Sequence, residues 1–111
     1  MALHRVSDEL TLHVPYAFAW GAVQEALLWL SLIVEPADPG VGDFRARTSI
    51  TPYAWGERIQ VHLWAITADR TGMSVESTSL FAFHDFGRNA KNIARVIDAV
   101  HRAMSTPPAT P

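Results

Sequence analysis

The sequence contains no cysteine, which excludes disulfides and thiolate metal sites. It also has no G-x-S-x-G motif and no Gly-rich phosphate loop, and its eleven acidic residues are scattered. His13, His62 and Glu76 could share one sheet face, but solvent-facing histidines are the favoured interpretation. We therefore expect no metal and no cofactor. The sequence favours a non-enzymatic protein, while an active site assembled from distant residues stays open.

An excess of charge of either sign is also missing. The formal net charge is −2, and eight of the nine basic residues are arginines. A charge this small gives no global attraction to nucleic acid or to an anionic membrane. Arg45 and Arg47 beside Trp64 could hold a single strand, but one aromatic side chain is a small stacking platform. We expect no nucleic acid partner, and the cysteine-free composition favours the cytoplasm.

The chain is short enough to form one domain. Residues 105–111, rich in Ser, Thr and Pro, are expected to be a disordered tail, which leaves a single domain over residues 1–104. The N-terminus has no apolar signal-peptide region. The most apolar stretch, residues 16–34, is long enough to span a bilayer, but Gln24 and Glu25 at its centre argue against this. We expect a soluble protein with no membrane span.

Alternating apolar and polar side chains predict four β-strands. These are expected at residues 8–14, 43–50, 57–67 and 73–83. The residues predicted to lie against the helices are Leu10, Leu12, Val14, Ile59, Val61 and Leu63. His62 and Trp64 should face the other side. In the last strand Ser77 and Ser79 interrupt the apolar face, so a β-bulge is expected near residues 77–80.

Two helices are predicted by apolar side chains at helical spacing. One is expected over residues 16–32, directly after Pro15, and the other over residues 88–104. The element order is then β-α-β-β-β-α. This order predicts an α+β fold, a four-stranded, mainly antiparallel sheet with two helices on one face. The other face of the sheet would be open or covered by another chain.

Two stretches of the sequence resemble known families. Trp55-Gly-Glu57, followed by Asp85-Phe-Gly-Arg-Asn-Ala-Lys-Asn-Ile93, resembles a family of small bacterial β-α-β-β-β-α domains without assigned function. The stretch Leu12-His-Val-Pro-Tyr-Ala-Phe-Ala-Trp20 is similar to the start of helix-grip proteins of the START and pollen-allergen type. That second resemblance implies binding of lipids or other apolar ligands in a cavity between the sheet and a long C-terminal helix.

The first helix has more apolar surface than one packing face needs. The C-terminal helix could hide part of this surplus, or another protein could cover it. The leading hypothesis is therefore a non-enzymatic interaction module that self-associates or binds a protein partner. The predicted partner-binding residues are Phe18, Leu28, Trp29 and Leu32 on the helix, with Trp64 and Ile66 on the open sheet face.

The alternative hypothesis is a helix-grip-like carrier or sensor of a small apolar ligand. Such a ligand would lie between the sheet and the helices, in a cavity lined by Trp20, Phe44, Phe81 and Ile97. Trp55, in the turn at residues 51–56, is instead expected to fold back over the edge of the core. The two hypotheses differ in whether a mutation at Trp29 changes the oligomeric state.

Overall fold

The structure is a computed structural model that describes residues 4–48, 56–79 and 87–105 of the chain. Its helices and strands follow one another as β1 (His4–Leu12), α1 (Tyr16–Trp29), β2 (Ile33–Val34), β3 (Asp43–Arg47), β4 (Glu57–Thr67), β5 (Arg70–Ser79) and α2 (Arg88–Ser105). None of the helices within these ranges is long and apolar enough to cross a membrane. The turn with Trp55 and most of the expected tail lie outside the described residues.

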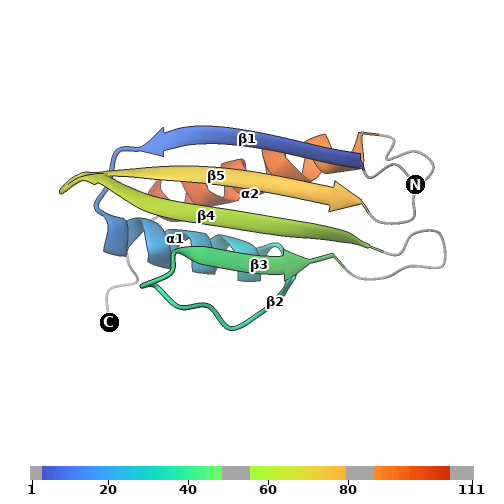
Figure 1. The fold of residues 1–111 in the computed structure, drawn as a ribbon, viewed down its shortest axis with the longest axis horizontal. Helices are drawn as coiled ribbons and strands as arrows, with labels where there is room; N and C mark the ends of the chain where they lie inside the picture. The colour runs from blue at the N-terminus through green and yellow to red at the C-terminus, as the bar shows by residue number, and fades with distance from the viewer. Residues whose placement is uncertain (1–3, 49–55, 80–86, 106–111) are drawn as a thin grey trace.

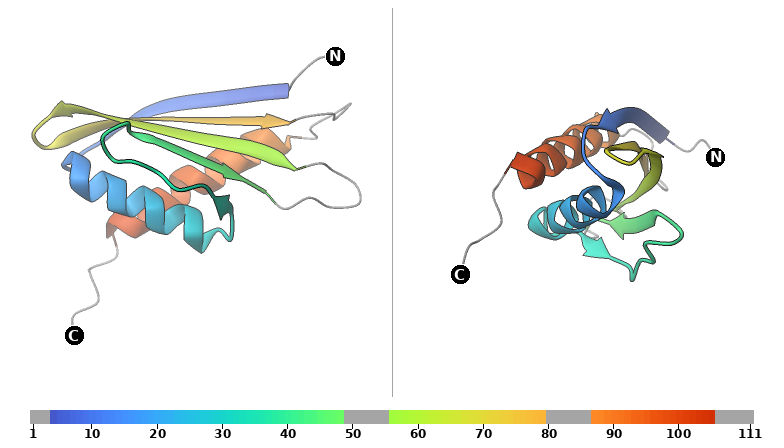
Figure 2. Two further views of the ribbon diagram at one scale, coloured as in Figure 1. Left: turned by 60° about the horizontal axis from the view of Figure 1, so that its bottom comes forward. Right: turned by 90° about the vertical axis from the view of Figure 1, so that its left-hand side faces the viewer.

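The strands form one antiparallel sheet in the order β1-β5-β4-β3-β2. Both helices cover the same face of this sheet, and α2 crosses behind β5 and β4 (Figures 1 and 2). The predicted α+β class and the two helices on one face are confirmed. The predicted number of strands is wrong, because the described part of the chain contains five strands where the sequence indicated four.

The strand missed by the sequence analysis is β2, which follows α1 almost at once. The expected helix at residues 16–32 ends three residues early, at Trp29. The Leu32 amide donates to the Leu27 carbonyl (3.3 Å) and the Ser31 amide to the Leu28 carbonyl (3.0 Å), while Ser31 has a φ of 60°. This pair of hydrogen bonds around a left-handed residue is a Schellman turn, which ends the helix.

The two residues of β2 then pair with the end of β3. Ile33 lies opposite Arg47, and Val34 lies opposite Ala46. Two residues are too few to show an alternating pattern, so no period-two signal marked this strand. Its position adds an edge to the sheet directly beside α1, and that position matters for the candidate site.

The predicted faces of β4 are confirmed. Ile59, Val61 and Leu63 are 3%, 0% and 2% exposed, whereas His62 and Trp64 are only partly buried. On β1 and in the residues that follow it, Leu12 is buried and Leu10 and Val14 are packed against the core as partly buried side chains. The apolar core therefore lies between the sheet and the two helices, as the period-two pattern predicted.

The interrupted apolar face of β5 has a different explanation from the expected β-bulge. The pairing of β5 with both neighbours runs without a shift as far as Ser79, and the register shift on β4 lies between Ala65 and Thr67. The bulge prediction is therefore wrong for residues 77–79, and Leu80 lies outside the described residues. Ser77 and Ser79 do point into the protein, where polar partners from α2 meet them.

Those partners belong to the motif that opens α2. Asn89 is fully buried, accepts a hydrogen bond from the Ser77 hydroxyl (2.7 Å) and donates to the Ser79 hydroxyl (2.9 Å). Asn92 donates to the Ser77 hydroxyl (3.2 Å). The hydroxyl groups of the two serines on the core face of β5 thus form hydrogen bonds with asparagines of α2. Buried polar groups require such partners. The two motif asparagines have a structural role.

Candidate functional site

A pocket of about 260 Å³ lies between α1 and the segment that joins α1 to β3. It is lined by Trp20, Gln24, Leu28, Val34, Glu35, Pro36, Ala37 and Phe44. The ring of Trp20 on α1 packs against the ring of Phe44 on β3, with centroids 4.0 Å apart. Because Phe44 is only 1% exposed, this aromatic pair joins the pocket to the core.

The chemistry of the pocket suits a small apolar molecule. Most of its lining side chains are apolar, and Glu35 is the only ionisable group among the described residues that line it. The volume lies just below the usual range for drug-sized ligands, about 300–1,000 Å³. Dry apolar cavities of roughly 150 Å³ are known to admit benzene, so one or two rings would fit a pocket of this size.

The wall opposite α1 is formed by residues 34–37, and the segment that follows them is held by Tyr16, at the first turn of α1. Its hydroxyl donates to the carbonyl of Pro39 at 2.5 Å. Burial raises the pKa of Tyr16, and the nearby charges of Asp38 and Asp43 raise it further. The neutral phenol, which is the form that can donate this hydrogen bond, is therefore the favoured form.

The turn that follows the pocket wall is organised internally by Asp38. One oxygen of its carboxylate accepts from the Gly40 amide (2.8 Å), and its backbone carbonyl accepts from the amides of Val41 and Gly42. Side-chain acceptance of this kind stabilises a tight turn. The segment identified from the sequence only as a break between elements thus supplies Pro36 and Ala37 to the pocket wall and continues into an ordered turn.

Half of the predicted ligand-binding set meets in this pocket. Trp20 and Phe44 touch there. Ile97 on α2 is partly buried against the core and does not line the pocket, and Phe81 lies outside the described residues. The sequence analysis missed the contribution of residues 34–37, because a two-residue strand and a Pro-containing segment carry no period.

The predicted partner surface on α1 is largely exposed. Phe18, Leu28 and Trp29 are 47%, 59% and 57% exposed, whereas Leu32 is partly buried against the core. The guanidinium of Arg102 on α2 lies over the Trp29 ring, 4.2 Å from its centroid. Part of the surplus is therefore covered from within the chain, which is one of the two alternatives that the sequence left open. Leu28 also lines the pocket.

The second predicted patch lies on the opposite side of the sheet. Trp64 lies across Gly72 on β5, directly opposite it in the register, and stacks 5.7 Å from His62. Ile66 is 48% exposed near the hairpin between β4 and β5. Because the helices cover the other face, this patch and the exposed residues of α1 do not form one continuous surface.

The histidine of the outer face pairs with an acid on the neighbouring strand. His62 Nδ1 lies 2.5 Å from the Asp43 carboxylate, and these residues are opposite each other in the register of β3 and β4. Within residues 4–48, 56–79 and 87–105, no three His, Cys, Asp or Glu side chains come together in a way that would hold a metal ion.

Comparison with solved structures finds other proteins that share this fold, with helices on one face of an antiparallel sheet. The ZhuI aromatase/cyclase from a Streptomyces species is 15% identical, with 94% of this chain and 87% of that chain covered and a TM-score of 0.57. A START superfamily protein from Mycobacterium smegmatis is 10% identical over 91% of this chain and 94% of that chain, with a TM-score of 0.58.

The protein Ara h 8.0201 also has this fold, with 13% identity over 93% of this chain and 95% of that chain and a TM-score of 0.65. Identities this low show a common fold only. They agree with the fold implied by the helix-grip resemblance of residues 12–20. A search against protein-family models finds no match, and neither does a search of curated proteins. The resemblance to the small bacterial family therefore stays a prediction.

Proposed function

We propose that the protein binds a small apolar ligand, one or two rings in size, in the pocket between α1 and the β2–β3 segment. The observation that carries this proposal is the contact of Trp20 with Phe44 in the pocket wall. Flat aromatic side chains offer a large apolar area at a small cost in conformational entropy, because each has only two side-chain torsions. Gln24 and Glu35 supply the polar groups that would orient a ligand.

The comparisons support an apolar ligand as the first class to test. Helix-grip proteins bind such ligands, and one structural neighbour is named an aromatase/cyclase. An aromatic ring system is therefore the chemistry we favour. A carrier or sensor role fits better than catalysis, because Glu35 is the only ionisable side chain of the described pocket lining.

A substitution that fills the pocket tests this proposal without changing a core residue. Ala37 lines the pocket from its exposed wall, so Ala37→Phe should occupy ligand space and leave Trp20 and Phe44 in place. With 1-naphthol as the probe in an NMR titration, the amides of α1 and β2 should shift in the wild type. The dissociation constant should rise at least about tenfold in the variant, equivalent to about 1.4 kcal/mol.

The matched control is Ala94→Phe, which adds the same side chain at an exposed position of α2. It should bind 1-naphthol like the wild type. No shift in the wild type at millimolar 1-naphthol, or equal weakening by the two substitutions, would count against an apolar site in this pocket.

Partner binding through α1 is the second candidate function. Its support is the exposure of Phe18, Leu28 and Trp29, three large apolar side chains of one helix. Large apolar side chains left exposed on one helix are candidates for contact with a partner. Leu28 belongs to both proposed surfaces, so a partner on α1 would also close the mouth of the pocket.

A further inference from the structure

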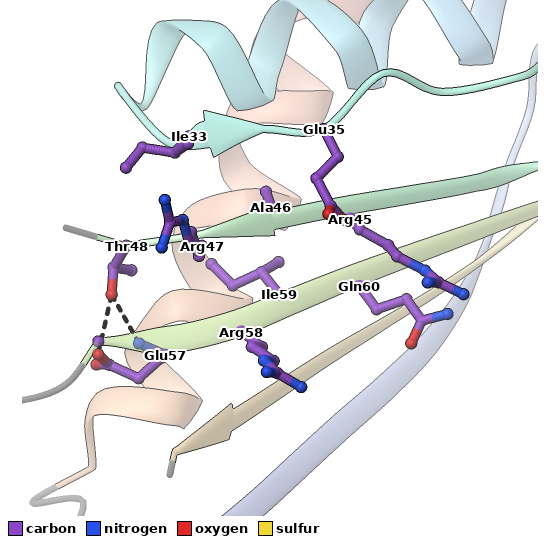
Figure 3. Close-up of a pocket in the computed structure, with 11 residues that line it drawn as sticks. Ile33, Glu35, Arg45, Ala46, Arg47, Thr48, Glu57, Arg58, Ile59 and Gln60 are labelled. Atoms are coloured by element: carbon purple, nitrogen blue, oxygen red, sulfur yellow. Dashed lines mark hydrogen bonds between the residues drawn. The ribbon is translucent and has the colours of Figure 1, made fainter. Parts of the chain in front are cut away.

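A second cavity, of about 650 Å³, lies beside β2, where β3 ends and β4 begins (Figure 3). Its volume falls within the range of about 300–1,000 Å³ that is usual for small-molecule sites. Its lining comprises Ile33, Glu35, Arg45, Ala46, Arg47, Thr48, Gly56, Glu57, Arg58, Ile59 and Gln60. Three of these residues are arginines, in a chain whose net charge is −2.

Strand register brings the arginines together on one face. Arg47 is directly opposite Arg58, and Ile33 is directly opposite Arg47, so these three residues form one row across β2, β3 and β4. Arg45 and Gln60 form the next row. Side chains that are opposite in an antiparallel pair lie on the same face, with Cβ atoms roughly 5 Å apart. All three arginines are exposed.

Two acids that share this face of the sheet have other partners: Glu76, opposite Gln60, pairs with Arg5, and Asp43 pairs with His62. In the part of the chain that the structure describes, Arg45, Arg47 and Arg58 form no ion pair, whereas Arg5 on β1 lies 3.5 Å from Glu76. Like charges placed directly opposite each other destabilise a sheet. Arg47 and Arg58 face each other on the adjacent strands β3 and β4, so a bound anion would reduce the repulsion between them.

The acids that line the cavity do not change this balance. The Glu57 carboxylate is bound by the Thr48 hydroxyl (3.0 Å), and Glu57 is only 8% exposed. Glu35 remains, and its backbone amide donates to the carbonyl of Arg45 (2.8 Å). Glu57 lies on the buried face of β4, opposite to the face that carries Arg58, so among the described lining residues Glu35 is the one carboxylate left on the side of the three guanidinium groups.

We infer that this cavity binds a small organic anion, with a phosphate or carboxylate group held by Arg47 and Arg58. The planar guanidinium group donates two parallel hydrogen bonds to either acid group, which a point charge cannot do. Arg45 adds a third cation, and the exposed side chain of Ile33 beside Arg47 offers contact for an apolar part of the ligand. This site is separate from the aromatic pocket, and the two share only Glu35.

The test uses phenyl phosphate and benzoate as anionic probes, with benzyl alcohol as their uncharged counterpart. In an NMR titration at low salt, at least one anion should shift the amides of β3 and β4, and benzyl alcohol should not. Their relative affinities show which acid group the site prefers. Binding should weaken as salt is added, because exposed charges are screened.

Three single substitutions locate the site. Arg47→Gln and Arg58→Gln should each raise the dissociation constant at least about tenfold. Arg70→Gln removes the same charge at the exposed hairpin end of β5, outside the cavity, and should leave binding unchanged. The inference is overturned if neither anion binds at low millimolar concentration, or if Arg70→Gln weakens binding as much as Arg47→Gln.

A thermal-shift measurement gives a readout that does not depend on resolving the bound state. Without ligand, Arg47→Gln should melt at a higher temperature than Arg70→Gln, because it removes one of two facing charges. Phenyl phosphate should raise the melting temperature of the wild type but not that of Arg47→Gln. A lower melting temperature for Arg47→Gln than for Arg70→Gln, with equal responses to phenyl phosphate, would contradict a built anion site.

Discussion

Gly21 and Gly72 have opposite surroundings. A Cβ atom at Gly72 would lie 2.1 Å from the Cε2 atom of Trp64, whereas a Cβ at Gly21 on α1 would meet nothing within 4 Å. The indole of Trp64 therefore lies flat on the sheet because Gly72, its opposite residue in the register, has no side chain. A tryptophan held in this way is partly buried although it faces away from the helices.

Replacing both glycines by alanine should have effects of opposite sign. Gly72→Ala should displace the Trp64 ring and lower the free energy of unfolding by about 1–3 kcal/mol, as overpacking does. Gly21→Ala should raise it by roughly 0.5–1 kcal/mol, because alanine favours a helix interior. Urea unfolding measures both, and the Trp64 indole N–H resonance should move only in Gly72→Ala. A neutral Gly72→Ala would show that the ring is free to move.

Tyr16 predicts a pH dependence. Its pKa is raised in the folded protein, by burial first and then by Asp38 and Asp43. The folded state therefore binds the phenolic proton more tightly than the unfolded state, whose pKa is about 10. The stability contributed by Tyr16 is fully present below pH 10 and is lost as the pH rises through the folded pKa.

The measurement is the free energy of unfolding between about pH 9 and 11.5. It should fall more steeply with pH in the wild type than in Tyr16→Phe, which has no proton to lose. Ligand affinity should fall over the same range, because the phenolate cannot donate to the carbonyl of Pro39, which follows the residues that line the pocket. Parallel stability curves for the two proteins would exclude this role of Tyr16.

At the scale of elements, the contact between β5 and α2 depends on a few polar side chains. Asn89→Ala should lower the free energy of unfolding by about 2–3 kcal/mol, because it leaves the buried Ser77 and Ser79 hydroxyls short of partners. Asn92→Ala should cost less, since Asn92 contributes one longer bond to Ser77. Urea midpoints decide the order, and a larger effect of Asn92→Ala would contradict it.

The elements also show what the sequence could and could not predict. Period two in β4 correctly placed Val61 inside and His62 outside, because one face of that strand is buried along most of its length. The same rule failed for β5, where Ser77 faces the core and is satisfied by a distant asparagine. Hydrogen bonds between side chains of different elements cannot be predicted from the periodicity of either element.

The candidate site was likewise predictable only in part. Trp20 and Phe44 were identified as pocket residues because both are large and belong to the core faces of their elements. The other wall was missed, since β2 has two residues and the segment after it depends on single hydrogen bonds such as that of Tyr16. The predicted partner-binding residues, both those on α1 and those on the outer face of the sheet, stay predictions.

At the scale of the whole molecule, Trp29 tests whether the protein self-associates or binds a partner through α1. If α1 is a contact surface, Trp29→Ala should weaken self-association or partner binding by about 2 kcal/mol or more, as buried aromatic anchors do. Analytical ultracentrifugation of wild type and variant measures this for self-association. Val41→Ala, at an apolar side chain that is 61% exposed on the β2–β3 segment, is the control. Trp64→Ala tests the outer sheet face in the same way.

A wild type that stays monomeric at high micromolar concentration would exclude self-association as the role of α1. Ligand binding would be unaffected by that outcome, because Trp29 does not line the pocket. A partner that does dock on α1 must meet the Arg102 guanidinium stacked on Trp29, so its surface should carry an acid or an aromatic ring there.

The wall formed after β2 has one more consequence, which concerns how ligand preference can change. Residues 34–37 supply half of the residues that line the aromatic pocket and form one continuous stretch of chain. They run from the last residue of the edge strand β2 to the turn at Asp38, away from the asparagine and serine contacts that hold α2 to β5. If the pocket binds the proposed ligand, exchange of this single stretch between related domains should change ligand specificity without changing the core.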